Sequence, residues 1–233
     1  MSEPILECRN LSKRYGSQTA LNGVNLCLER GRIAGLLGPN GSGKTTLIKL
    51  ANGLLQPSDG EVLIGGGKTG VESKAAVSYL PDRFIVSGWM RITEILSFFA
   101  GFYADFHRDA AETMLANLGI RLDKQFKTLS KGNREKVQLI LVMARTARLY
   151  LLDEPIGGVD PAARDYIINT IINNYSEDAA VLISTHQIQE VEQILDDVVF
   201  LKEGGIILQG RADDIRSENG MSIDRLFREV FKC

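Results

Sequence analysis

The chain has 233 residues, of which 44% are apolar and 24% charged, and 27 Lys and Arg against 29 Asp and Glu give a formal net charge of −2. This is the composition of an ordinary globular protein with room for a sizeable core in one or two domains. The slight acidic excess argues against a sequence-independent nucleic-acid binder, which normally carries a strong basic excess.

The sequence also limits where the protein is expected to work. Its three cysteines (Cys8, Cys27 and Cys233) are odd in number and far apart, which is typical of a reducing compartment. The first segment, MSEPILECRN, lacks the basic and apolar regions of a secretory signal. The apolar stretch 137–144 is about half the length that spans a bilayer. We therefore expect any association with a membrane to be made through a partner.

Short apolar and β-branched runs recur along the chain, and several precede helical patterns, which predicts an α/β protein with a parallel sheet. The runs are residues 5–8, 23–28, 32–37, 61–64, 76–80, 149–152, 179–184, 197–201 and 206–208. The first 30 residues and the hairpin-like segment 197–208 look antiparallel, and we expect both to flank the parallel core. Between the runs, residues 84–147 show helical periodicity and predict a helical insert between two halves of the sheet.

A glycine-rich segment follows the apolar run that ends at residue 37 and precedes a helical pattern over 44–50. It matches G-x-x-x-x-G-K-[ST], a loop whose N–H groups and helix dipole bind phosphates. We expect Lys44 to bridge β- and γ-phosphate oxygens and the Thr45 hydroxyl to coordinate Mg²⁺. The predicted phosphate-binding residues are Gly38, Pro39, Asn40, Gly41, Ser42, Gly43, Lys44, Thr45 and Thr46.

Two carboxylates follow the buried run 149–152. Asp153, at the end of a strand beside a phosphate loop, is placed to hold Mg²⁺ directly or through water. Glu154 would point toward the γ-phosphate and polarise the attacking water. Two acids at a strand end usually form a solvated turn, so it is the phosphate loop upstream that favours the catalytic interpretation.

Further motifs, in this order, resemble the nucleotide-binding subunit of an ATP-binding-cassette (ABC) transporter over essentially residues 3–210. The segment LSKGN resembles the signature loop, usually L-S-G-G-Q, which in that family binds the γ-phosphate held by the opposite subunit of a head-to-tail dimer. Ser130 and Gly132 agree with this pattern, whereas Lys131 and Asn133 depart from it. Ser130 is also a good helix N-cap, and a capped helix N-terminus is itself an anion site, so both roles are compatible.

Four more residues gain a role through the same resemblance. Tyr15 resembles the aromatic that stacks on adenine, and Asp82, in YLPD, replaces the usual glutamine of the lid loop, where an acid would reach Mg²⁺ or its water. Asp160 resembles the D-loop residue at the dimer interface, and His186 resembles the switch histidine that contacts the γ-phosphate. Each also has a local interpretation, as a packed tyrosine, a loop residue or a helix cap. His107 matches no motif and is expected on the surface.

The resemblance implies an α/β fold, a P-loop NTPase (RecA-like) core with an antiparallel β subdomain and an inserted α-helical subdomain. We expect one ATPase domain over residues 1–233, made of a core (1–83 and 148–210), a helical insert with the signature helix (84–147) and a short helical tail (211–233). The tail carries an amphipathic pattern that would dock either on the core or on a partner, with Ile223, Leu226, Phe227 and Val230 on one face.

The implied function is that of an ATP-hydrolysing subunit with ATP and Mg²⁺ as cofactors. Two copies, or one copy and a related ABC ATPase subunit, would sandwich two ATP molecules. The pair would drive a separate transmembrane permease from the cytoplasmic face of the cell membrane, and no nucleic-acid partner is expected. The short region after the last strand, the variant signature and the YLPD segment favour an exporter.

The predicted insert is rich in aromatic residues, which either fill its own core or line a groove for a short helix of the permease. They are Trp89, Phe98, Phe99, Phe102, Tyr103 and Phe106. Two alternatives stay open. One is a soluble ABC-type ATPase used in assembly or regulation, such as a cluster-assembly component. The other is a catalytically weak, regulatory half of a heterodimer. Copurification with a membrane protein would separate the first alternative from a transport role.

Overall fold

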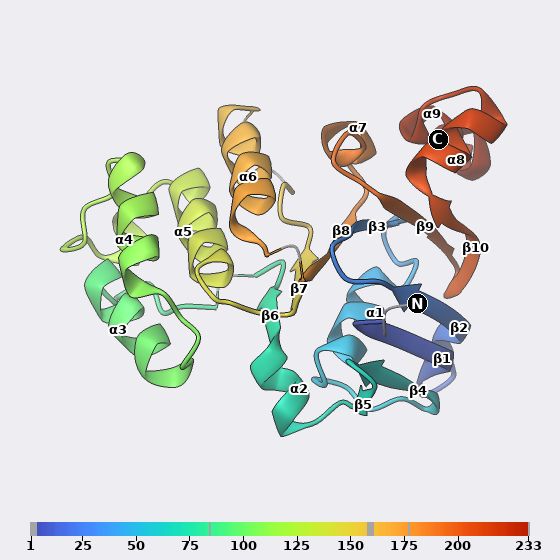
Figure 1. The fold of residues 1–233 in the computed structure, drawn as a ribbon, viewed down its shortest axis with the longest axis horizontal. Helices are drawn as coiled ribbons and strands as arrows, with labels where there is room; N and C mark the ends of the chain where they lie inside the picture. Colours follow the sequence, from blue (N-terminus) through green and yellow to red (C-terminus); the bar gives the residue numbers. More distant parts are fainter. Residues whose placement is uncertain (1–3, 84, 158–160, 177, 233) are drawn as a thin grey trace.

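The computed structural model describes residues 4–83, 85–157, 161–176 and 178–232. A six-stranded sheet forms its centre, a four-stranded sheet lies against one side, and a group of helices extends from the other end (Figure 1). The six strands, in spatial order, are β10 (Gly205–Arg211), β9 (Asp197–Lys202), β3 (Ile33–Leu37), β8 (Ala180–Thr185), β7 (Leu149–Asp153) and β6 (Val77–Leu80).

The central strands of this sheet are buried along their whole length. β3, β7 and β8 contain only buried residues, which is typical of parallel strands covered on both faces. β6, β7, β8, β3 and β9 run parallel, and β10 pairs antiparallel with β9 at one edge. The carboxyl ends of the parallel strands therefore meet at one edge, where ligands of open α/β sheets bind.

The second sheet is antiparallel and holds β2 (Gln18–Leu28), β1 (Leu6–Tyr15), β4 (Asp59–Ile64) and the short β5 (Gly67–Lys68). Helix α1 (Lys44–Ala51) is packed between the two sheets, because Leu47 and Ile48 share a buried cluster with Leu6 of β1 and Leu36 of β3. This packing fixes the helix that begins at the phosphate loop. A short helix, α2 (Val71–Ala76), links β5 to β6.

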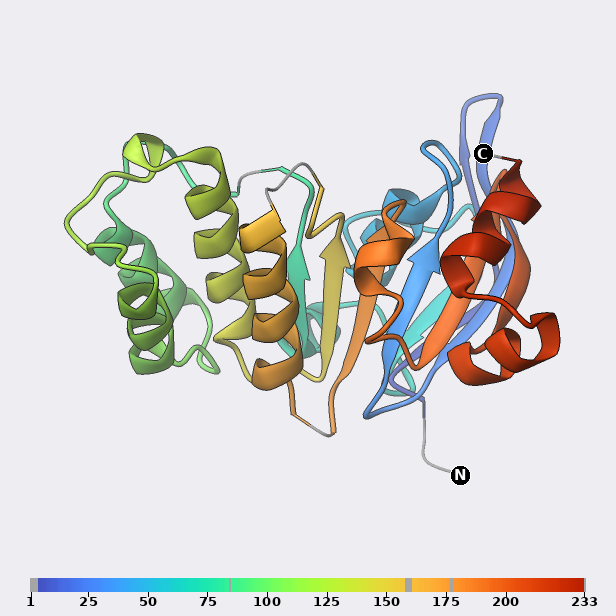
Figure 2. The same cartoon turned by 90° about the horizontal axis from the view of Figure 1, so that it is seen from above.

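The opposite face of the six-stranded sheet is covered by α6 (Pro161–Asn174), α7 (Ile188–Val191), α8 (Ala212–Asn219) and α9 (Ile223–Phe231). Seen from above, these helices line one side of the sheet (Figure 2). The apolar face predicted for the tail docks on the core, since Ile223, Leu226 and Phe227 are buried there and Val230 packs against the same cluster.

Residues 85–147 hold α3 (Ile92–Phe102), α4 (Arg108–Asn117), a 3₁₀ turn η1 (Phe126–Thr128) and α5 (Lys131–Met143). These helices share a separate buried cluster that includes Ile95, Leu115 and Ile140. His107 is exposed at the N-cap of α4, as expected. Of the helices in the described ranges, none is long and apolar enough to cross a membrane.

The strands differ from the expectations in three respects. Segment 197–208 is a hairpin, but β9 belongs to the parallel core and only β10 is antiparallel, since the hairpin pattern does not say what β9 pairs with on its other side. The first two strands are also longer than their apolar runs. β2 begins at Gln18, five residues before its predicted run 23–28, and most of these first residues are not buried, so no apolar run marks them. Strand β5 carries no apolar residue and was not expected.

Candidate active site

The phosphate loop connects the end of β3 to the start of α1. Gly43, the N-cap of α1, has a φ of 111°, a conformation that favours glycine. A Cβ on Gly43 would lie 2.6 Å from the carbonyl oxygen of Ala20 and 2.8 Å from a methyl of Leu21. The backbone oxygen of Ser42 accepts a hydrogen bond from the Gly204 N–H at 3.0 Å. Neighbouring segments therefore fix the shape of the loop.

Lys44 is buried beneath this loop. Its Nζ donates to the carbonyl oxygens of Gly38 at 2.7 Å and Pro39 at 3.2 Å, and lies 3.7 Å from Glu154 Oε1. Burial lowers the pKa of Lys44, and the nearby carboxylates of Glu154 and Asp153 partly oppose that shift. The result is a cation held in place before any phosphate arrives.

Asp153 ends β7 opposite the start of α1. Its Oδ1 accepts hydrogen bonds from Ser184 Oγ at 2.5 Å and from Thr45 Oγ1 at 3.2 Å. Its Oδ2 is buried and has no hydrogen-bond partner among the described residues. Burial raises the pKa of Asp153, with the hydrogen bonds from Ser184 and Thr45 opposing the shift. An unpartnered carboxylate oxygen beside a hydroxyl is an oxygen donor set that suits Mg²⁺, so these residues fit that ion.

Glu154 follows directly and adopts a left-handed backbone conformation with a φ of 52°, which is uncommon for a residue with a side chain. Its N–H donates to the carbonyl oxygen of Ser184 at 3.0 Å. Its carboxylate accepts from Thr185 Oγ1 at 3.2 Å and lies 3.0 Å from His186 Nδ1. Because a carboxylate only accepts, Nδ1 carries the proton in this contact.

Lys44 and Glu154 line one cavity of about 570 Å³. Asp153 and His186 are not among its described lining residues and are connected to it through their contacts with Thr45 and Glu154. The loop residues Gly38, Pro39 and Ser42, also predicted to bind phosphate, do not line it either. Tyr15, whose ring is 46% exposed, and Asp82 lie on the same cavity as Lys44 and Glu154. The other predicted residues lining it are Asn40, Gly41, Gly43, Thr45 and Thr46.

The cavity also contains residues that the sequence did not single out. Glu203 and Gly204 form the turn between β9 and β10, both with positive φ (49° and 80°), and Gln18, Thr19 and Ala20 come from the start of β2. The Gly204 N–H bonds to the phosphate loop, as described above. The glycine pair after Glu203 signals a turn, but only the tertiary packing brings that turn to the loop.

Residues 21–157 match the family model described as ABC transporter. The chain belongs to the ABC transporter family. It is an ATP-binding subunit of that family, whose members bind ATP and are ATPases that drive transport. The predicted fold class, a P-loop NTPase core with an antiparallel sheet and an inserted helical subdomain, is confirmed.

The ABC relatives cover nearly the whole chain. Linearmycin resistance ATP-binding protein LnrL of Bacillus subtilis is 29% identical, over 93% of this chain and 72% of its own. SkfA peptide export ATP-binding protein SkfE of the same organism is 28% identical, over 87% of each chain. A solved structure of an ATP-binding subunit of an ABC transporter superposes with a TM-score of 0.85 at 28% identity, over 97% of this chain and 99% of the other.

The two predicted residues of the signature loop do not line the cavity. Ser130 is the N-cap of α5 and accepts a hydrogen bond from the Asn133 N–H at 3.2 Å, so its structural role is present. Among the described residues that line the cavity, neither Ser130 nor Gly132 appears. Asp160 lies outside the described residues. Lys131 Nζ is 3.7 Å from Glu135 Oε1.

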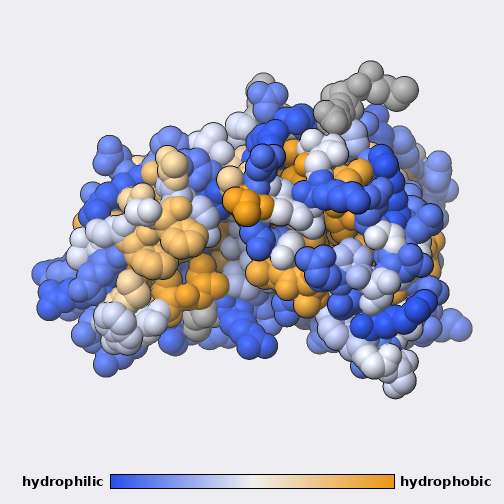
Figure 3. Space-filling view, turned by 90° about the horizontal axis from the view of Figure 1, so that it is seen from below, coloured by the Kyte–Doolittle hydropathy of each residue, from blue (hydrophilic) through white to orange (hydrophobic). Residues whose placement is uncertain are grey.

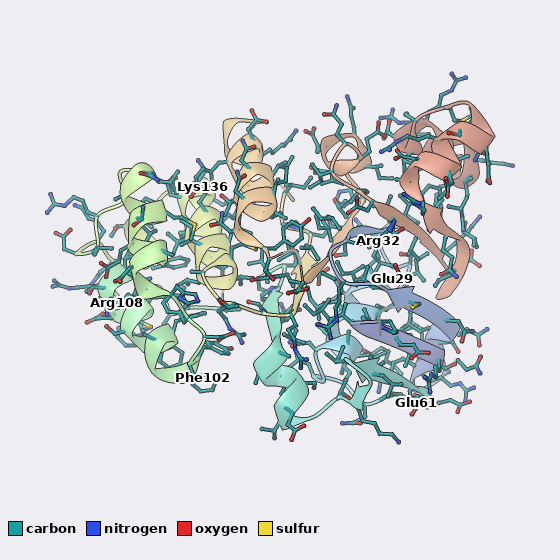
Figure 4. All side chains as sticks on the ribbon, viewed as in Figure 1. Glu29, Arg32, Glu61, Phe102, Arg108 and Lys136 are labelled. Carbon is teal, nitrogen blue, oxygen red and sulfur yellow. The ribbon has the colours of Figure 1, made fainter. Side chains whose placement is uncertain are left out.

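A second hollow of the subunit, of about 730 Å³, lies between the helical insert and the core. The rings of Trp89, Phe98 and Phe102 are 66%, 58% and 71% exposed, whereas Phe99 and Phe106 fill the insert core. Hydrophobic surface gathers over this end of the insert when the molecule is seen from below (Figure 3). Phe102 lies where α3 approaches α2 (Figure 4).

Arg145 joins this insert to the core. Its buried guanidinium donates to both carboxylate oxygens of Asp105 at 3.0 and 3.1 Å, and to the carbonyl oxygens of Val77 at 2.7 Å and Ala75 at 2.8 Å. It also lies 3.9 Å from the centroid of the Tyr103 ring, which lines the hollow. The Arg145 side chain therefore links Tyr103, which lines the hollow, to Val77 at the start of β6.

Proposed function

We propose that this ABC subunit hydrolyses ATP in the cavity of the phosphate loop and thereby drives a separate membrane permease that exports its substrate. The observation that carries the proposal is that Lys44, Thr45 and Glu154 line one cavity while Asp153 and His186 contact Thr45 and Glu154, so that the start of α1 and the ends of β7 and β8 meet at one site. Buried charges that hydrogen bonds already orient are the arrangement that phosphoryl transfer needs, because it depends on positioning and charge stabilisation.

Each residue then has one task. Lys44 places its ammonium against the phosphate oxygens, and the loop N–H groups hold them. Thr45 and Asp153 hold Mg²⁺, with Asp82 as a further ligand from the loop after β6. Mg²⁺ in that place supplies charge neutralisation at the β- and γ-phosphates. Glu154 orients the attacking water, and Tyr15 stacks on the adenine, where a π-face adds about 1 kcal/mol.

His186 supports the same reaction from the opposite side of Glu154. With its Nδ1 proton directed at the carboxylate, its Nε2 edge would face the γ-phosphate. The intact contact between Glu154 and His186 argues against a catalytically weak regulatory subunit. The soluble assembly role is also not favoured, since the relatives named above serve transport or resistance.

We propose that the site is completed by a second ABC subunit, either a copy of this chain or a relative. Ser130 caps a helix whose exposed N-terminus is suited to an anion, yet it does not line its own subunit's cavity within the described residues. In a head-to-tail dimer, Ser130 and Gly132 would meet the γ-phosphate held by the other subunit. Asp160 would lie at the same interface.

The exposed rings beside the insert are the proposed docking site for the permease. Trp89, Phe98 and Phe102 form an open apolar groove of the kind that receives an amphipathic helix. The permease would hold the subunit at the cytoplasmic face of the membrane. Export is supported by the relative SkfE, which is named for peptide export.

We propose, finally, that the chain acts as one ATPase domain in which the 84–147 insert receives the permease and the core hydrolyses ATP. Arg145 supports this division because it contacts both Tyr103, which lines the groove, and Val77 of β6. The chain continues from the end of β6 to Asp82, which lines the cavity.

Purification of the tagged chain from detergent-solubilised membranes tests the transport role. The proposal predicts that a polytopic membrane protein and a second ABC ATP-binding chain are recovered in stoichiometric amounts. The variant Phe102→Ala should lose the membrane protein, whereas a variant at the exposed surface of α4, Asp109→Ala, should keep it. Recovery of the chain with soluble partners alone would contradict the proposal.

A further inference from the structure

The C-terminal tail is packed against the segment that carries His186. Helices α8 and α9 lie beside α7 on the same face of the six-stranded sheet (Figures 1 and 2). Ile223 and Leu226 of α9 share a buried cluster with Ile188 and Val191 of α7. No part of the proposed reaction uses this tail, although it adds two helices to the core.

Glu192, the C-cap residue of α7, makes the polar contacts between these elements. Its Oε2 accepts a hydrogen bond from the Asp224 N–H at 2.8 Å, at the start of α9. Its backbone oxygen accepts from the guanidinium of Arg216 in α8. Its own N–H donates to the carbonyl oxygen of Ile188 at 2.9 Å. A single residue therefore closes α7 and joins it to both helices of the tail.

The start of α7 is linked to the Glu154 carboxylate through the Thr185 hydroxyl. The Gln187 N–H donates to Thr185 Oγ1 at 2.9 Å, and Thr185 Oγ1 donates to Glu154 Oε2 at 3.2 Å. His186 lies between them with its side chain 42% exposed, so packing holds the ring only weakly. Its placement at Glu154 depends on the backbone of residues 185–188, which α7 anchors. A four-residue helix is too short to hold this position by its own hydrogen bonds.

We infer that Glu192 is a positioning residue that, by joining the tail to α7, holds the His186 imidazole at the Glu154 carboxylate. The inference rests on the proposed function only for its consequence in catalysis. The geometric part concerns the nucleotide-free protein and stands on the contacts of Glu192 and of residues 185–188.

The chain contains two histidines, which makes the imidazole resonances in NMR spectra a direct probe. His107 serves as an internal reference, since it lies in the helical insert with its Nε2 2.6 Å from Thr146 Oγ1. In Glu192→Ala we expect the His186 signals to shift and broaden while the His107 signals stay unchanged. Glu192→Gln keeps an oxygen that accepts from the Asp224 N–H and should restore the wild-type signals. The matched control Glu218→Ala, at an exposed acid in α8, should change neither histidine.

Steady-state kinetics measure the consequence for hydrolysis. We expect Glu192→Ala to lower the kcat of ATP hydrolysis about tenfold with KM nearly unchanged, because a small displacement of a reacting group mainly affects the transition state. Glu192→Gln should recover the wild-type kcat. If Glu192→Ala does not fold, Arg216→Ala removes the other contact and should shift the His186 signals in the same way.

The two arms separate this inference from the proposed function. Folded Glu192→Ala with wild-type His186 signals would overturn the inference, whatever the activity. Wild-type protein without ATPase activity would overturn the proposed function, while the His186 signals would still decide the positioning role. An equal loss of kcat in Glu192→Ala and Glu192→Gln would show that the charge matters rather than the hydrogen bond, and would also overturn the inference.

Discussion

The nucleotide cavity and the groove beside the insert are built from opposite kinds of side chain. The cavity holds buried charges, with Lys44 at 6% and Asp153 at 1% exposure, and each is oriented by hydrogen bonds within the chain. The groove holds aromatic rings that stand open, with Phe102 at 71% and Trp89 at 66% exposure. In the proposed function, the first region is arranged for its ligand before binding, whereas the rings of the second region would become buried only when the permease binds.

This difference predicts how each region responds to the substitution of a side chain. Buried charges depend on every neighbour, because a charge or polar group left without its partner inside a protein is strongly destabilising. Phe98 and Phe102 stack on each other at the surface, and Phe102 also contacts the Tyr103 ring. Because these contacts are not deeply buried, the loss of an exposed ring should leave the fold intact and mainly affect the partner. The predictions below test this contrast, beginning with the largest effect.

Lys44→Ala should lower ATP hydrolysis about 1,000-fold, the loss expected when a main electrostatic donor is removed from a preorganised site. Phosphate release under saturating ATP measures this effect. Lys49→Ala, on the same helix α1, is the matched control and should change the rate less than about twofold. A Lys44→Ala enzyme within tenfold of the wild type would show that the buried cation is not needed.

Phe99→Ala and Phe102→Ala form a pair that differs in burial. Phe99 is 6% exposed in the insert core, so its truncation should lower the free energy of unfolding by about 3–5 kcal/mol. Phe102→Ala should change stability by less than about 0.5 kcal/mol and weaken permease binding by about 2 kcal/mol. Thermal unfolding and pull-down with the permease measure the two effects. Equal destabilisation by both variants, or full permease binding by Phe102→Ala, would remove the groove from its role.

Asp153→Asn should stabilise the nucleotide-free protein by about 1 kcal/mol while abolishing stabilisation by Mg²⁺ with ATP. The folded-state pKa of Asp153 is raised by burial, so the folded protein binds this proton more readily than the unfolded chain. This contribution is fully present below the ordinary pKa near 3.8 and is lost as pH rises through the raised value.

Ionised Asp153 therefore destabilises the ligand-free protein at neutral pH, and the asparagine removes that charge. Unfolding curves at several pH values, with and without nucleotide, check the effect. Asp109→Asn, at an exposed position of α4, should show neither change. A less stable Asp153→Asn protein would contradict the assigned cause of the pKa shift.

The nucleotide cavity could be predicted from the sequence because phosphate chemistry prescribes residue types at fixed spacing. Gly43 with its positive φ, Lys44 beneath the loop and the carboxylates after β7 follow from the motif and its strand context. The turn at Glu203 and Gly204 could not be predicted as part of the cavity. Its contribution comes from a packing contact with the loop that leaves no local pattern.

The fold was predictable where patterns are local. The buried runs of β3, β7 and β8 and the helical insert were expected, whereas the parallel pairing of β9 with β3 depends on contacts between distant segments. The apolar face of α9 was evident in the sequence, but its docking against α7 was not. The sequence predicted only that the insert is rich in aromatic residues. It could not tell which of these rings are exposed, because a surface that binds a partner follows no fixed sequence motif.

Glu154→Gln tests the central claim, that the cavity hydrolyses ATP through this carboxylate, most directly. Equilibrium ATP binding and single-turnover hydrolysis should be measured for this variant and for Glu203→Gln, which alters another acid lining the same cavity. We predict that Glu154→Gln binds ATP like the wild type and hydrolyses it at least about 100-fold more slowly, a loss of about 2.7 kcal/mol of transition-state stabilisation, whereas Glu203→Gln stays near the wild-type rate. Hydrolysis by Glu154→Gln within a few-fold of the wild type would contradict the account.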